Sequence, residues 1–180
     1  MSTLADRLRA VHDALNSAGF RHAFGGAIAL AYCTEEPRGT RDLDVNVFVG
    51  ADRAEQVLDA LPQGVSVTQA DRRRAKDEGQ VRVMWEDTPI DLFFDMHEFH
   101  HQVEAEVVEV PFEDTTIPVL GCDALVVFKA MFNRTRDWAD IEAMLEAGTA
   151  NGLRALKASR SLLGESDPAV ARLQALVQGA

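Results

Sequence analysis

The sequence predicts an α+β protein, with a mixed β-sheet flanked by helices and a small helical subdomain at its C-terminal end. Residues 42–49 alternate polar and apolar side chains, which is the two-residue period of a strand with one buried face. Residues 80–85 and 90–95 also have the pattern of strands, and the turn residues 86–89 between them indicate an antiparallel hairpin. From Cys122 onward the apolar spacing becomes helical. Helices gathered after a strand-rich half favour the α+β class.

The other elements follow from the same two periodicities and from the breaks between them. Apolar residues at positions 4, 8, 11 and 15 have helical spacing and predict a helix before the first strand. We expect that strand at residues 20–24, ended by Gly25-Gly26, with a helix at residues 27–32 after it. The rest of the chain is predicted to form a helix at 53–61, short strands at 65–69, 107–110 and 116–119, and helices at 122–133, 137–146 and between 153 and 177.

The chain of 180 residues has the length of one ordinary domain. We expect a core over residues 1–119 and a helical subdomain over residues 120–180, with a single compact domain as the alternative. No stretch approaches the ~20 apolar residues of a membrane-crossing helix, and the first residues are too polar and acidic for a secretory signal. Cys33 and Cys122 form no CxxC pair, so we expect reduced thiols in a cytoplasmic protein.

The strongly acidic composition restricts the kind of partner. The formal net charge is −11, whereas non-specific binding of long nucleic acids needs clustered Lys and Arg to replace counterions. A small or nucleotide-sized partner is therefore favoured. A local basic patch that meets one end of an RNA remains compatible with this total.

Three aspartates have the arrangement of a metal-binding set. Asp42 and Asp44 are two residues apart on a predicted strand, so their carboxylates project from one face, roughly 7 Å apart along the chain. Asp91 lies on a later strand with the same alternation, and Asp95 competes with it for the third position. Carboxylates held together repel one another, and Mg²⁺ ions, which prefer oxygen ligands, would stabilise such a cluster.

The pair Gly25-Gly26 adds a candidate phosphate-binding turn. Glycine has no Cβ, so its backbone can adopt a positive φ and approach an anion closely. The amides at the start of the following helix would then point at a phosphate.

These motifs occur in an order that resembles the DNA polymerase β-like nucleotidyltransferase superfamily. The resemblance rests on residues 24–30 (FGGAIAL), 37–45 (PRGTRDLDV), 89–93 (PIDLF), 122–130 (CDALVVFKA) and 136–141 (RDWADI). The chain is most similar to the small bacterial members grouped with AbiEii-type toxins and antibiotic nucleotidyltransferases. The resemblance implies a nucleotidyltransferase core followed by the helical subdomain.

The resemblance also implies residue roles. Asp42, Asp44 and Asp91 would be catalytic and bind two Mg²⁺, or Mn²⁺ in their place. The phosphates of a nucleoside triphosphate (NTP) would contact Gly25, Gly26, Arg38, Thr40 and Lys129. Asp137 and Asp140 would brace the site. The implied reaction transfers a nucleoside monophosphate (NMP) to a hydroxyl group and releases pyrophosphate.

Several alternatives stay open. The acceptor is either the end of a tRNA or another RNA, as for a toxin with a cognate antitoxin protein, or a small molecule such as an antibiotic. The rival from another class is a non-catalytic module of the same fold that acts as an antitoxin or regulatory partner. Loss of one of the acids would mark such a module, and this sequence retains all three. A third reading is an unrelated α+β binding domain whose aspartates face solvent.

We expect two further groups of polar residues to form solvent-exposed loops rather than binding sites. Arg72 to Lys76 is a basic run that could meet RNA, a nucleotide or an acidic partner, but we expect a solvated loop. His97, His100 and His101 could bind zinc by spacing, but no cysteine supports them, so we expect a polar loop after the strand.

Overall fold

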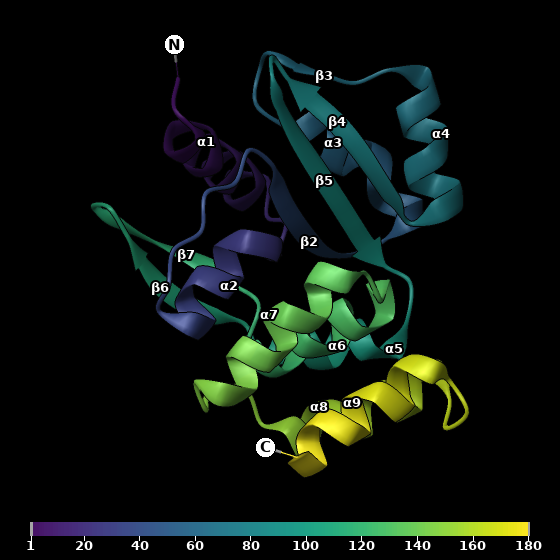
Figure 1. Cartoon of the computed structure of the whole chain (residues 1–180). Coiled ribbons are helices and arrows are strands. Elements are labelled where there is room, and N and C mark those ends of the chain that lie inside the picture. The colour runs from purple at the N-terminus through teal and green to yellow at the C-terminus, as the bar shows by residue number, and fades with distance from the viewer. Residues whose placement is uncertain (1, 180) are drawn as a thin grey trace. The chain divides into compact units, whose positions relative to one another are not determined.

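The structure, a computed structural model, describes residues 2–179 and divides into two compact units. The first unit comprises the described residues up to Ile28 together with Gly39–Val119, and we call it the sheet unit. The second comprises Ala29–Arg38 and the described residues from Leu120 onward, and we call it the helical unit. Figure 1 shows the course of the chain through both.

All seven strands described in the structure belong to one mixed sheet in the sheet unit, which confirms the α+β class. The strands are β1 (His22–Phe24), β2 (Leu43–Gly50), β3 (Val65–Ser66), β4 (Gln80–Trp85), β5 (Thr88–Asp95), β6 (Val108–Phe112) and β7 (Thr115–Val119). Their order across the sheet is β3-β4-β5-β2-β1-β7-β6. The pairs β2–β5 and β1–β7 are parallel, and the other neighbours are antiparallel.

The helices of the sheet unit are α1 (Leu4–Ser17), α3 (Ala54–Ala60), α4 (Gln69–Glu78) and α5 (Glu98–Ala105), with a 3₁₀ turn η1 (Ala51–Arg53). The helical unit contains α6 (Cys122–Phe132), α7 (Thr135–Glu146), α8 (Gly152–Leu163) and α9 (Pro168–Gly179). Helix α2 (Gly26–Thr34) starts in the sheet unit and ends in the helical unit. Among residues 2–179, no helix is both long enough and apolar enough to cross a membrane.

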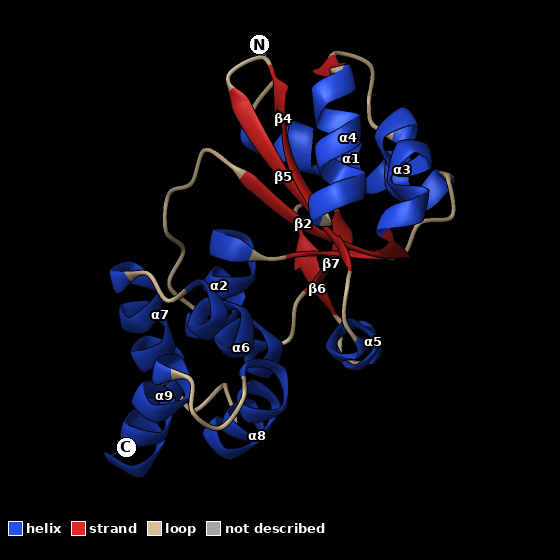
Figure 2. Ribbon diagram, turned by 90° about the vertical axis from the view of Figure 1, so that its right-hand side faces the viewer, coloured by secondary structure: helices blue, strands red, loops and turns tan. Residues whose placement is uncertain are grey.

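Strand alternation gives the sheet two chemically different faces, as the sequence predicts. On β2 the side chains of Leu43, Val45 and Val47 are buried, and on β5 the same holds for Ile90, Leu92 and Phe94. Helices α1, α3 and α4 lie on one side of the sheet (Figure 2), so the buried side chains fill the layer between helices and strands. The intervening polar residues of both strands point to the opposite face.

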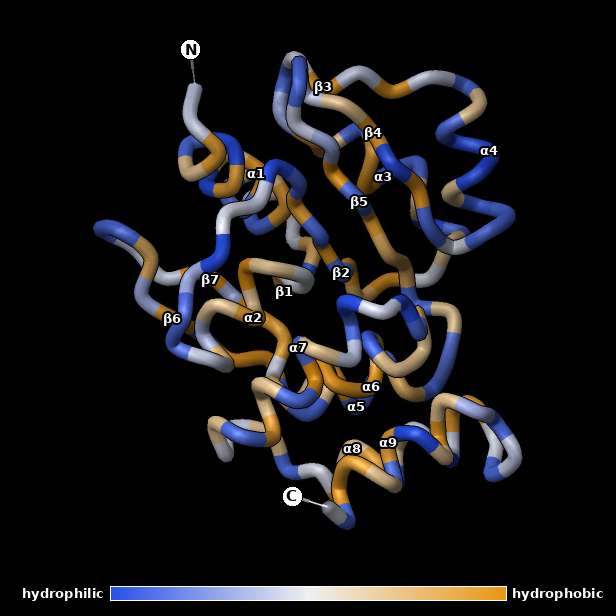
Figure 3. The backbone as a smooth tube through the Cα atoms, viewed as in Figure 1, coloured by the Kyte–Doolittle hydropathy of each residue, from blue (hydrophilic) through white to orange (hydrophobic). Residues whose placement is uncertain are grey.

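Two segments predicted as loops are helical. The basic run Arg72 to Lys76 lies inside α4, which begins with a capping box between Thr68 and Asp71 and ends at Gly79 with a φ of 66°. Burial of Ala75 anchors this helix, whose other residues are largely hydrophilic, as Figure 3 shows. The run's polarity therefore marks a solvated helix face rather than a loop.

The histidine segment after β5 is the second such correction. His100 and His101 lie in α5, and His97 precedes its first residue. Helix α5 buries His100 and Val103, so its period is helical despite its polar composition.

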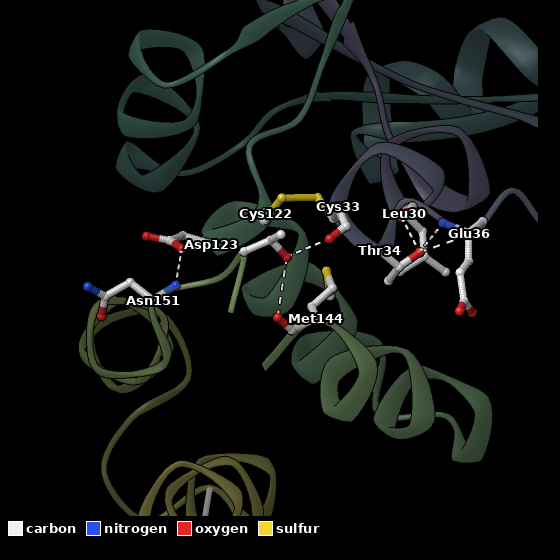
Figure 4. Close-up of a disulfide and its surroundings, with 9 residues drawn as sticks. Leu30, Cys33, Thr34, Glu36, Cys122, Asp123, Met144 and Asn151 are labelled. Atoms are coloured by element: carbon white, nitrogen blue, oxygen red, sulfur yellow. Dashed lines mark hydrogen bonds between the residues drawn. A yellow bond between two sulfur atoms is a disulfide. The ribbon is translucent and has the colours of Figure 1, made fainter. Parts of the chain in front are cut away.

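The expectation of reduced cysteines is wrong. Cys33 at the end of α2 and Cys122 at the start of α6 form a disulfide, with 5.7 Å between their Cα atoms (Figure 4). Both residues belong to the helical unit, where the Thr149 hydroxyl also donates a hydrogen bond of 2.5 Å to the Cys33 carbonyl oxygen. The cysteines are 89 residues apart, so only the tertiary fold reveals the pair.

Reducing the disulfide should destabilise the helical unit. A cross-link that closes a loop of 89 residues restricts the unfolded chain, which is worth up to about 4 kcal/mol. Calorimetry with and without reductant should show a lower unfolding temperature for the reduced protein. The double variant Cys33→Ser/Cys122→Ser should match the reduced protein and not respond to reductant; a transition that reductant leaves unmoved in the wild type would contradict the disulfide.

Protonation of His22 should destabilise the sheet unit. The residue is only 5% exposed, its Nε2 lies 3.0 Å from His12 Nδ1, and burial lowers its pKa from 6.5 to about 4. The neutral form is favoured in the folded state, so this contribution is complete above pH 6.5 and is lost as the pH falls toward 4. The shift corresponds to about 3 kcal/mol. Urea unfolding between pH 7 and pH 4 should therefore show a steeper loss of unfolding free energy for the wild type than for His22→Gln. The same pH dependence in both proteins would contradict the role of His22.

Candidate functional site

Two of the predicted acids are direct neighbours in the sheet. Strand β2 pairs with β5 in parallel, and the register places Asp44 opposite Asp91. Adjacent strands lie about 4.8 Å apart, and register partners point to the same face. Both residues are partly exposed on the polar face of the sheet. The structure thus brings together two carboxylates that are 47 positions apart in the sequence (91 − 44).

The third acid, Asp42, lies one residue before β2. Thr40 orients it, because the Thr40 hydroxyl donates a hydrogen bond of 2.5 Å to Asp42 Oδ1. The Asp42 amide in turn donates to the Thr40 hydroxyl oxygen at 3.3 Å. These two predicted site residues therefore form one local unit at the entrance to the strand.

The diglycine bend lies directly against Asp44. The Gly25 amide donates a hydrogen bond of 2.8 Å to the Asp44 carbonyl oxygen. Gly26, the first residue of α2, has a φ of 50°, and a Cβ built on it would lie only 2.6 Å from Asp44 Cγ. A side chain at position 26 would therefore overlap the carboxylate and hold a strained backbone. The bend therefore lies beside one of the three predicted acids, Asp44.

Arg82 on β4 is a neighbour of the candidate acids that the sequence analysis missed. Its Nε donates to Asp91 Oδ1 at 2.7 Å and its Nη2 donates to Asp91 Oδ2 at 2.6 Å. The antiparallel register of β4 and β5 sets Arg82 opposite Asp91, so Arg82, Asp91 and Asp44 form one row across three strands. The hydrogen bonds and charge of Asp91 raise the pKa of Arg82, and Asp42 and Asp44 add smaller contributions of the same sign.

The acids offer only oxygen ligands, which suits Mg²⁺ or Mn²⁺. In the part of the chain that the structure describes, no three His, Cys, Asp or Glu side chains are gathered closely enough to hold a metal ion. Hydrogen bonds account for the separation of these carboxylates, because that of Asp91 is directed at Arg82 and that of Asp42 at Thr40. The donor chemistry fits such a metal: Asp44 and Asp91 are in register on one face, and the absence of a Cβ at Gly26 leaves room for the Asp44 carboxylate.

The remaining two predicted residues meet in the helical unit. Arg38 binds Asp140 with two hydrogen bonds of 2.7 and 3.1 Å, and Lys129 Nζ lies 2.6 Å from Asp140 Oδ2. Lys129 is also 3.6 Å from Asp137 Oδ1. Burial by itself would raise the pKa of Asp140, but the hydrogen bonds from Arg38 and Lys129 outweigh it and lower that pKa. Asp140 therefore holds both cations in one cluster.

Comparison with known proteins identifies the fold. Neither a protein-family model nor a curated protein sequence matches the chain. The solution structure of the antibiotic-resistance factor ANT(2'')-Ia matches with a TM-score of 0.60 at 9% identity, over 97% of this chain and 95% of that chain. The lincomycin-bound lincosamide antibiotic adenylyltransferase LnuA matches with a TM-score of 0.54 at 14% identity, over 78% of this chain and 96% of its own.

A third match comes from Paracoccidioides brasiliensis. Its antigenic nucleotidyltransferase-like protein has a TM-score of 0.53 at 14% identity, over 96% of this chain and 91% of that chain. The similarity of these structures and the mixed sheet with following helices agree with one another. The chain has the nucleotidyltransferase fold.

Proposed function

We propose that this protein is a metal-dependent nucleotidyltransferase that moves an NMP from an NTP to a hydroxyl group. The observation that carries the proposal is the pairing of Asp44 with Asp91 beside the Gly25-Gly26 bend, in a chain with the nucleotidyltransferase fold. The two like charges repel each other, and a divalent cation would relieve the repulsion that the ion pair between Arg82 and Asp91 leaves.

Each group of site residues would have a separate role in the reaction. The amides from Gly26 onward, at the start of α2, would bind phosphate oxygens, while the Gly25 amide holds the bend against the Asp44 carbonyl oxygen. The acceptor hydroxyl would lose its proton to Asp91 while its oxygen attacks the α-phosphorus. The bond from that phosphorus to the bridging oxygen would break, and pyrophosphate would leave. Mg²⁺ or Mn²⁺, held by Asp42, Asp44 and Asp91, would stabilise the charge on the attacking and leaving oxygens.

Thr40 and Asp140 would orient other groups in this proposal. Thr40 fixes the Asp42 carboxylate through its 2.5 Å hydrogen bond. Arg38 and Lys129 stay the predicted phosphate-binding cations, and Asp140 would keep both side chains in place. Lys129 is buried, so its ammonium needs this carboxylate partner in any state without a bound anion.

We favour a small hydroxyl-bearing molecule as the acceptor. The net charge of −11 opposes the binding of extended nucleic acid. Two matched structures point the same way: ANT(2'')-Ia has been solved with adenylyl-2''-tobramycin, and LnuA with lincomycin. The specific proposal is nucleotidylation of an antibiotic in the cytoplasm, where NTP is available.

An AbiEii-like toxin is the second candidate. It would modify an RNA end and pair with a cognate antitoxin. It is favoured by residues 24–30 and 37–45, whose pattern resembles that of the subset that contains these toxins.

The proposed metal site can be tested by titration. Calorimetry of an NTP with Mg²⁺ should show binding that Asp42→Asn and Asp44→Asn each weaken at least tenfold, because each change removes a charged oxygen ligand. Asp77→Asn, which alters an exposed acid of α4, is the matched control and should bind as the wild type does. Unchanged binding in both site variants would remove the proposal.

Transfer assays separate the two acceptors. The four NTPs, labelled at the α-phosphate, would be tested in turn. At least one should transfer its label to an aminoglycoside or lincosamide in the wild type but not in Asp44→Asn. Label that appears only in RNA would instead establish the toxin-like function. Absence of transfer to either class, with NTP binding intact, would favour the non-catalytic module.

Gly26→Ala should damage the site more than the fold. The new methyl group would displace the Asp44 carboxylate, and the positive φ adds about 1–2 kcal/mol of strain. We expect at least tenfold weaker Mg²⁺–NTP binding from a protein that still unfolds cooperatively. Gly39→Ala is the control, because a Cβ at Gly39 meets no atom within 4 Å. Equal affinities in the two variants would contradict the close approach of Gly26 to Asp44.

A further inference from the structure

We propose that Arg82 is a positioning residue that occupies the Asp91 carboxylate as a resident counter-ion, which a divalent cation must displace. This inference rests on the proposed function and adds a residue that the sequence motifs do not contain. It predicts an unusual sign: removing a site residue should strengthen metal binding rather than weaken it.

The hydrogen bonds of Arg82 support the first step. Its two donors reach separate oxygens of Asp91, at 2.7 and 2.6 Å, so the guanidinium covers both. A carboxylate paired in this way directs one lone pair of each oxygen at arginine. Asp91 therefore cannot bind a cation with both oxygens on that side until Arg82 moves.

The exposure of the two side chains supports the second step. The Arg82 side chain is 57% exposed, whereas that of Asp91 is 16% exposed. Asp91 belongs to a strand paired on both sides, with Arg82 opposite on β4 and Asp44 opposite on β2. Arginine is thus the partner that can swing into solvent. The carboxylate stays in place to receive the cation.

The local charge balance supports the third step. Arg82, Asp91 and Asp44 form one row across three strands, so the guanidinium lies on the same face as these acids. In the absence of a metal, Arg82 offsets part of the repulsion between these acids. Once a divalent cation is bound, the same positive charge opposes it. Arg82 therefore stabilises the metal-free site at the expense of metal affinity.

Binding of Mn²⁺ alone tests this inference without any measurement of activity. We would follow the electron paramagnetic resonance signal of free Mn²⁺ as it is titrated into the wild type and Arg82→Gln. Arg82→Gln should bind about tenfold more tightly, because it removes one adjacent like charge and frees both oxygens. Arg82→Lys retains the charge but not the two-pronged contact, so its affinity should rise only a few-fold. Arg73→Gln removes an exposed positive charge on α4 and should match the wild type.

A double-mutant cycle shows whether Arg82 acts through Asp91. In an Asp91→Asn background, Arg82→Gln should produce a smaller gain, since the neutral side chain holds the arginine weakly and only the removal of the positive charge still acts. A full gain in that background would overturn the proposed role. So would wild-type or weaker Mn²⁺ affinity in both Arg82→Gln and Arg82→Lys, with thermal unfolding showing both folded.

The outcome also separates this inference from the proposed function. If Asp44→Asn abolishes Mn²⁺ binding while the Arg82 variants leave it unchanged, the metal site stands and the role of Arg82 falls. If no protein binds Mn²⁺ at a saturable site, both fall together.

Discussion

The parallel pairing of β2 with β5 is the constraint on which the site depends. It places Asp44 beside Asp91 on one face, while the alternate residues of both strands are buried beneath the helices. A shift by one residue would turn the acids into the core and the apolar side chains out. The buried face therefore fixes the register, and the register fixes the acids. Electrostatic repulsion between them is the cost that packing of the apolar face overcomes.

The faces of the strands could be predicted from sequence, but their exact neighbours could not. A hairpin loop at residues 86–89 would pair Trp85 with Ile90 and so set Arg82 opposite Phe93. The real turn has two residues, because β5 begins at Thr88, and this moves Arg82 opposite Asp91. Part of the reason is distant: the buried Arg7 of α1 binds Glu86 and Asp87 at 2.5 and 2.7 Å. Such a contact leaves no periodic signal.

In the helical unit too, the sequence predicted the elements but not which cysteines and charged residues contact one another. Helical spacing located α6 to α9, but neither spacing nor composition indicated that Cys33 and Cys122 meet. Lys129 and Arg38 were assigned to phosphates by motif, and the structure adds that both are held by Asp140. Lys129, Asp137 and Asp140 are buried, and their charges are compensated by one another and by Arg38 and Arg134. This charged cluster therefore stabilises the fold, in addition to any role in binding a ligand.

The contact between Gly26 and Asp44 couples two positions in evolution. A chain that keeps an acid at position 44 in this rotamer cannot admit any larger residue at position 26. A lineage that discards the acid is released from that restriction at once, apart from the residual preference for glycine at a φ of 50°. Paired substitution at 26 and 44 among descendants would therefore mark the branches in which the chemistry has been abandoned while the fold persists.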